Sequence, residues 1–93
     1  MQAPELLAAL EELAQEVGLP VRRMPATGPF DGLLPAQSGV CVLRGQRSVW
    51  LSPADPPERQ IAALARALRE HAGASLEMRF LPPAIRACLE QNA

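Results

Sequence analysis

GVCVLRGQRSVWLS, residues 39–52, holds two runs of β-branched and apolar residues on either side of Gly45-Gln46. A glycine followed by a polar residue is typical of a two-residue type II′ turn, so this stretch predicts a β-hairpin. Counting outward from the turn pairs Cys41 with Trp50. Both faces of this hairpin are partly apolar, so we expect helices to cover each face and to bury Trp50 between the hairpin and a helix.

A helix is predicted on each side of the hairpin. Upstream, apolar residues recur at helical spacing over residues 4–17, and Gly18 supplies a C-terminal stop. Downstream, Asp55 is placed as an N-cap before Pro56, and an apolar stripe continues to a helix end near His71. The two helices are long enough to cover a small sheet.

Two further strands and a short helix complete the predicted order. Residues 21–24 lie between prolines and predict a short edge strand. Alternation over residues 76–81 predicts a half-buried strand, and Pro82-Pro83 opens a last helix. The prediction is a single α+β domain, residues 1–93, in the order α-β-β-β-α-β-α, with the hairpin at the centre of a small, mainly antiparallel sheet.

Composition excludes several classes of function. The net charge of −1 provides no field that would attract nucleic acid, so a nucleic-acid partner is not expected. The sequence contains no run of about 18 apolar residues, so no membrane partner is expected. It also lacks a basic segment followed by an apolar one at its start, and we expect a cytoplasmic protein.

No catalytic, cofactor or metal site is expected from the residue pattern. The sequence lacks the glycine-rich motifs that bind phosphate, the GxSxG motif of a nucleophile elbow and the HExxH motif of a zinc-binding helix. His71 is the single histidine, and we interpret it as complementing the C-terminal end of its helix. Cys41 and Cys88 lie far apart in apolar settings and are interpreted as buried free thiols. The alternative is a small enzyme with a site near His71 that no sequence motif reveals.

The segments ELLAALEELAQEVGLPV (5–21) and GVCVLRGQRSVWLSPADPPERQIAALARAL (39–68) carry a resemblance. The chain resembles small uncharacterised bacterial proteins whose layout is similar to the N-terminal half of zincin metallopeptidases that cleave phage and stress-response repressors. In those enzymes the helix after the hairpin carries HExxH. Here Ala65, Arg66 and Arg69 stand at those three positions, and none can bind zinc as required. The resemblance therefore implies a degenerate zincin-like domain without the activity.

The connection over residues 25–38 carries three large apolar side chains in a stretch rich in Pro and Gly. They either fold back as a lid over the sheet or contact another chain, and the sequence favours neither. The edge strand offers a second surface, because its unpaired backbone could pair with a copy of itself. We expect a non-enzymatic protein–protein interaction module that binds a protein partner or self-associates as a homodimer. The candidate interface residues are Phe30, Leu33, Leu34, Val21, Arg22 and Arg23.

Overall fold

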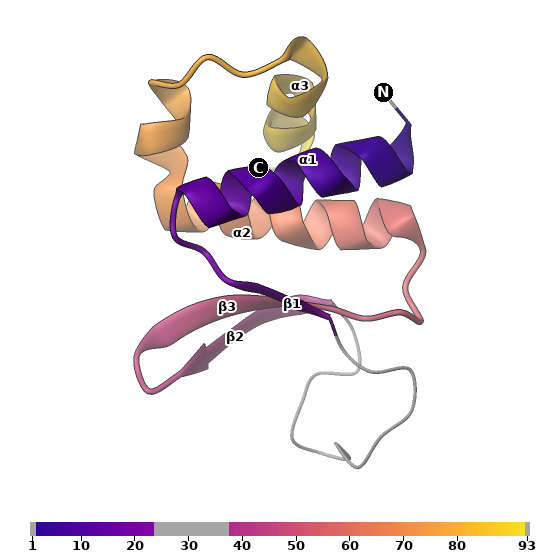
Figure 1. Cartoon of the computed structure of the whole chain (residues 1–93), viewed down its shortest axis with the longest axis vertical. Coiled ribbons are helices and arrows are strands. Elements are labelled where there is room, and N and C mark those ends of the chain that lie inside the picture. Colours follow the sequence, from indigo (N-terminus) through magenta and orange to yellow (C-terminus); the bar gives the residue numbers. More distant parts are fainter. Residues whose placement is uncertain (1, 24–37, 93) are drawn as a thin grey trace.

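A computed structural model describes residues 2–23 and 38–92, in which the helices lie together over a small sheet (Figure 1). The α+β class is confirmed, and the element order matches the prediction closely, except that the predicted strand over residues 76–81 is not formed. Residues 76 and 77 are helical, and residues 78–81 form a turn and an irregular connection. The elements are α1 (Ala3–Glu16), β1 (Val21–Arg23), β2 (Gly39–Leu43), β3 (Gln46–Leu51), α2 (Pro57–Glu77) and α3 (Pro83–Gln91).

The sheet is mixed and has the strand order β1-β3-β2. β2 and β3 form the predicted antiparallel hairpin, whereas β1 runs parallel to β3. A parallel pair needs a long connection between its strands, and the chain between β1 and β3 contains both residues 24–38 and β2. A mainly antiparallel sheet was predicted, and the parallel pairing of β1 with β3 is where the structure differs from it.

The hairpin turn lies one residue earlier than predicted. Its central residues are Arg44 and Gly45, with φ angles of 54° and 78°, which makes the turn type I′ rather than type II′. Cys41 consequently pairs with Ser48, and the predicted pairing of Cys41 with Trp50 is wrong. Moving the turn by one residue shifts the pairing by two positions, so each side chain stays on the face that was predicted.

The core lies between the helices and one face of the sheet. Helices α1 and α2 both cover this face (Figure 1), where Val49 and Leu51 are almost completely buried. Trp50 points to the other face and is only partly buried, so its predicted burial between the hairpin and a helix is wrong. Its Nε1–H donates to Ser48 Oγ at 3.1 Å. The largest fully buried side chains are Leu10, Leu19, Leu51, Leu64, Leu68 and Val49.

Helix α2 continues past its predicted end. Ala72 has non-helical angles (φ −144°, ψ 33°) that kink the helix where a stop was predicted, but helical structure resumes through Glu77. The predicted strand over residues 76–81 is therefore wrong. The alternation there does not mark a buried face, because Met78 and Phe80 are 89% and 94% exposed. α3 forms as predicted and buries Ile85, Cys88 and Leu89.

The end of α1 follows the prediction and positions β1. Gly18 has a φ of 78°, and the N–H of Leu19 returns to the carbonyl oxygen of Ala14 at 2.8 Å. This closure buries the Leu19 side chain and directs the chain into the sheet. Within residues 2–23 and 38–92, no helix has the length and apolar character needed to cross a membrane.

Candidate functional site

The outer edge of β2 carries backbone hydrogen-bonding groups that point away from β3. On β3, the N–H of Val49 donates to the carbonyl oxygen of Pro20, just before β1, at 2.9 Å. Val49 therefore turns its polar backbone groups away from Val40, its partner on β2, and the two form a non-hydrogen-bonded pair. The N–H and C=O of Val40 point out of the sheet, and those of Val42, two residues on, point the same way. Other described residues form no hydrogen bond with them.

The side chains of the β2 edge are apolar and exposed. Val40 and Val42 lie on the helix-covered face, and they are 38% and 62% exposed. The strand GVCVL carries no charge and no proline. Soluble proteins usually protect an open sheet edge with charged residues, proline or a bulge, because an unprotected edge pairs with other strands. β2 has none of these, so it is an edge suited to strand pairing.

At the start of β2, a hydrogen bond to the Asp55 side chain satisfies the backbone N–H of the residue before the strand. The N–H of Ser38 donates to Asp55 Oδ2 at 2.8 Å. This bond keeps the pKa of the Asp55 carboxyl below its usual value, so the carboxylate is anionic at neutral pH. The bond therefore contributes stability above the ordinary pKa of 3.8, and this stability is lost as the pH falls through the lower folded-state pKa. The predicted N-cap role is wrong, since α2 begins at Pro57 after an N-cap at Pro56.

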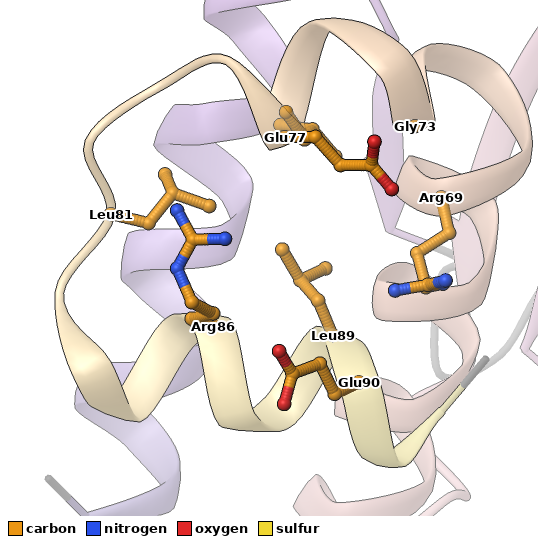
Figure 2. A pocket seen from close by; sticks show the side chains of 8 residues that line it. Arg69, Gly73, Glu77, Leu81, Arg86, Leu89 and Glu90 are labelled. Atoms are coloured by element: carbon orange, nitrogen blue, oxygen red, sulfur yellow. The ribbon is translucent and has the colours of Figure 1, made fainter.

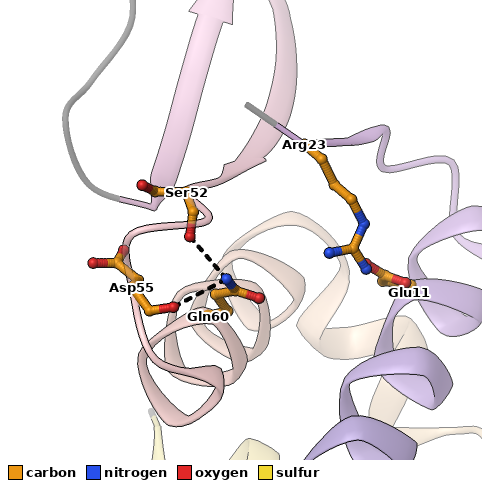
Figure 3. A network of polar contacts seen from close by, with 5 residues as sticks. All are labelled: Glu11, Arg23, Ser52, Asp55 and Gln60. Atoms are coloured by element: carbon orange, nitrogen blue, oxygen red, sulfur yellow. Dashed lines mark hydrogen bonds and ion pairs between the residues drawn. The ribbon is translucent and has the colours of Figure 1, made fainter. Parts of the chain in front are cut away.

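Gln60 fixes the connection that carries Asp55 (Figure 3). The buried Gln60 side chain donates through Nε2 to the carbonyl oxygens of Ser52 at 2.8 Å and Asp55 at 3.2 Å. Ser38 Oγ accepts the N–H of Ser52 at 2.8 Å. The start of β2, the end of β3 and the start of α2 are thus joined by one polar network. The sequence alone does not mark Gln60 as a buried residue, because a glutamine in the first turns of a helix is usually exposed.

The opposite sheet edge, β1, is short and charged. Arg22 and Arg23 are exposed, Val21 is partly buried, and Arg23 Nη2 lies 2.6 Å from Glu11 Oε1 on α1 (Figure 3). These three candidate interface residues therefore lie together at an edge, as predicted for residues 21–24. Their charges make this edge less suited to pairing than β2. The other candidates, Phe30, Leu33 and Leu34, lie outside the described residues.

His71 lines an open hollow of about 680 Å³, together with Glu70 and Arg47. Its Nε2 lies 3.3 Å from the carbonyl oxygen of Val17, so the residue expected to complement the end of α2 instead meets the end of α1. No serine, threonine or cysteine is among the described residues that line the hollow.

A second hollow of about 280 Å³ lies between the kinked end of α2 and α3 (Figure 2). Leucine side chains form its apolar part. Its rim carries two arginines and two glutamates, which balance in charge and select neither an anion nor a cation. Arg86 donates a hydrogen bond through Nη2 to the carbonyl oxygen of Arg79 at 3.0 Å. The charged rim residues are Arg69, Glu77, Arg86 and Glu90.

The two cysteines differ in accessibility. Cys88 is buried as predicted, and this burial raises the pKa of its thiol, which the Asn92 side chain contacts. Cys41 was also predicted to be buried, but it is only partly buried, because its side chain lies on the sheet face away from the helices. Among the described residues, no three His, Cys, Asp or Glu side chains lie together as a metal site would require. At the HExxH positions, Ala65 is buried and Arg66 and Arg69 are exposed.

Comparison of the chain with protein-family models, curated proteins and solved structures finds no match.

Proposed function

We propose that the chain is a non-enzymatic protein–protein interaction module that assembles with a second copy of itself along β2. One observation carries the proposal: Val40 and Val42 combine exposed apolar side chains with backbone groups that point out of an uncharged edge strand. Adding a strand to such an edge satisfies the N–H and C=O groups and buries the valines together. Within residues 2–23 and 38–92, no hydrogen bond satisfies these groups in the single chain.

The β2 edge is a better pairing surface than the β1 edge. β2 has five residues and β1 has three, so β2 supports more interchain hydrogen bonds. Two copies paired along β1 would bring Arg22 and Arg23 together across the interface, which is destabilising. The candidate contacts through Phe30, Leu33 and Leu34 are additional predictions for the same module.

Catalysis near His71 and descent from a zincin are weaker proposals. His71 and Glu70 both line the hollow, but the described residues that line it include no serine, threonine or cysteine that could act as a nucleophile. Ala65, Arg66 and Arg69 are consistent with a degenerate zincin-like layout and supply no metal chemistry. Both cysteines are free, which supports the proposal of a reducing, cytoplasmic setting.

Val42→Lys is expected to convert the assembly into monomers. The substitution places an ammonium group on each of two facing edges, and we expect the dissociation constant to rise at least about 100-fold, equivalent to about 2.8 kcal/mol. The native chain should show twice the chain mass by gel filtration with light scattering, and the variant should show the single chain mass. Met78→Lys is the matched control, because Met78 is 89% exposed on the turn after α2.

The control should retain the dimer. A native chain that is monomeric at every concentration contradicts the proposed function, as does a dimer that Val42→Lys leaves intact. Circular dichroism of the variant confirms that the exposed substitution has not unfolded the chain.

A further inference from the structure

We propose that the two copies pair β2 against β2 in antiparallel orientation, about a two-fold axis beside Cys41, to form one six-stranded sheet. The inference rests on the proposed self-association and adds the register and the residues that fix it. It follows from which backbone groups point out of the edge, from the charges at the two ends of β2, and from the position of a free thiol.

The backbone limits the possible registers. An antiparallel hydrogen-bonded pair joins two residues whose N–H and C=O both face the partner strand, and on the β2 edge these are Val40 and Val42. Pairing Val40 with Val42 of the second copy, and the reverse, aligns the full strand Gly39–Leu43 with itself. Pairing Val42 with its own copy would set Gly39 against Gly45, which belongs to the turn. The first register uses the whole strand.

The side chains fit this register. Val40 and Val42 lie on the helix-covered face of the sheet, since Val40 is paired with the buried Val49. Opposite residues of an antiparallel pair point to the same face, so the four valines of the dimer gather on one side. Their exposed fractions of 38% and 62% would fall, and this buried apolar area contributes to the association.

Charges at the ends of β2 are complementary across the axis. The register sets Arg44 of one copy opposite Ser38 of the other, and Ser38 is bonded to the Asp55 carboxylate at 2.8 Å. Arg44 is exposed and follows directly after the strand. Each end of the paired strands therefore brings a guanidinium near a carboxylate, while β2 itself contributes no like charges. Such rim pairs add little affinity but favour one register over another.

Cys41 provides a chemical test, because the register sets it opposite Cys41 of the second copy. The two residues form a non-hydrogen-bonded pair, with Cα atoms about 4.5 Å apart. Disulfides span Cα separations of about 4.4 to 6.8 Å. An added diazene oxidant such as diamide accepts two electrons and two protons from the two thiols, becomes a hydrazine, and leaves an interchain S–S bond. Cys88 is buried and its thiol pKa is raised, so it should react slowly.

The experiment oxidises the full chain carrying Cys88→Ala with diamide and follows covalent dimer by intact mass spectrometry without reductant. We expect most of the chain to become disulfide-linked dimer, and none of it to do so when Cys41→Ser is added. Val42→Lys should slow the reaction at least about 10-fold, by lowering the dimer population. Arg44→Glu should slow it more than Arg69→Glu, which makes the same charge change at an exposed position of α2, beside the hollow between α2 and α3.

The outcomes separate the register from the proposed function. If light scattering gives a dimer that Val42→Lys dissociates, but Cys41 forms no disulfide, the register is overturned and the proposed function stands. If the chain is monomeric and forms no disulfide, both are overturned. If Val42→Lys leaves the rate of disulfide formation unchanged, the thiols meet by random collision and the register is again overturned.

Discussion

Leu64→Ala should destabilise the fold by about 3 to 5 kcal/mol, the range for a leucine removed from a rigid core. Leu64 is 0% exposed and lies on α2, in the cluster that joins both long helices to the sheet. Alanine is the best helix former, so the loss measures the cavity and the lost burial rather than helix propensity. For a domain of this size the loss is a large part of the total stability. Urea denaturation followed by circular dichroism measures it.

Leu6→Ala is the matched control. Leu6 lies on α1 and is only partly buried against the same core, so the same change should cost less than half as much. A loss below about 1 kcal/mol for Leu64→Ala would mean that α2 does not pack on the sheet as described.

Gln60→Met should destabilise the fold by about 1 to 3 kcal/mol. Methionine has a similar length but no donor, so the carbonyl oxygen of Asp55 loses the N–H that now reaches it at 3.2 Å. The carbonyl oxygen of Ser52 loses the Gln60 N–H at 2.8 Å and keeps only the backbone N–H of Asp55 at 3.1 Å. Gln60→Glu should cost more at neutral pH, because a carboxylate would then face two carbonyl oxygens. Thermal and urea unfolding of the three chains gives the comparison.

Gln91→Met provides the control for Gln60→Met, since Gln91 is exposed near the end of α3 and should tolerate the change. Equal stability of Gln60→Met and the native chain would contradict the polar network drawn in Figure 3.

Elements specified by nearby residues were predicted well from the sequence. The α1 stop at Gly18, the hairpin and α3 follow from apolar periodicity and from glycine or proline at their ends. The turn was misplaced by one residue because Gly45 suits either turn type, and only the positive φ of Arg44 distinguishes them. The strand predicted over residues 76–81 failed because alternation identifies a strand only where one face is buried.

The candidate site depends on contacts between distant residues, which periodicity does not reveal. β2 becomes an open edge only because β1 pairs with the other side of β3. The hydrogen bond from Ser38 to Asp55 joins residues that are 17 positions apart in the sequence, and the contact of His71 with Val17 joins residues that are 54 positions apart. The sequence did indicate that an open strand edge could serve self-association, but it pointed to residues 21–24.

Two amide protons report on whether β2 pairs with β2. The Val40 and Val42 N–H groups point out of the sheet of a single chain, whereas the Val49 N–H is bonded within it at 2.9 Å. Hydrogen exchange followed by NMR over a series of protein concentrations compares the three. Pairing predicts that Val40 and Val42 become protected as concentration rises, while Val49 stays protected throughout. Val40 and Val42 amides that exchange as fast as the turn amide of Gly45 at every concentration would contradict it.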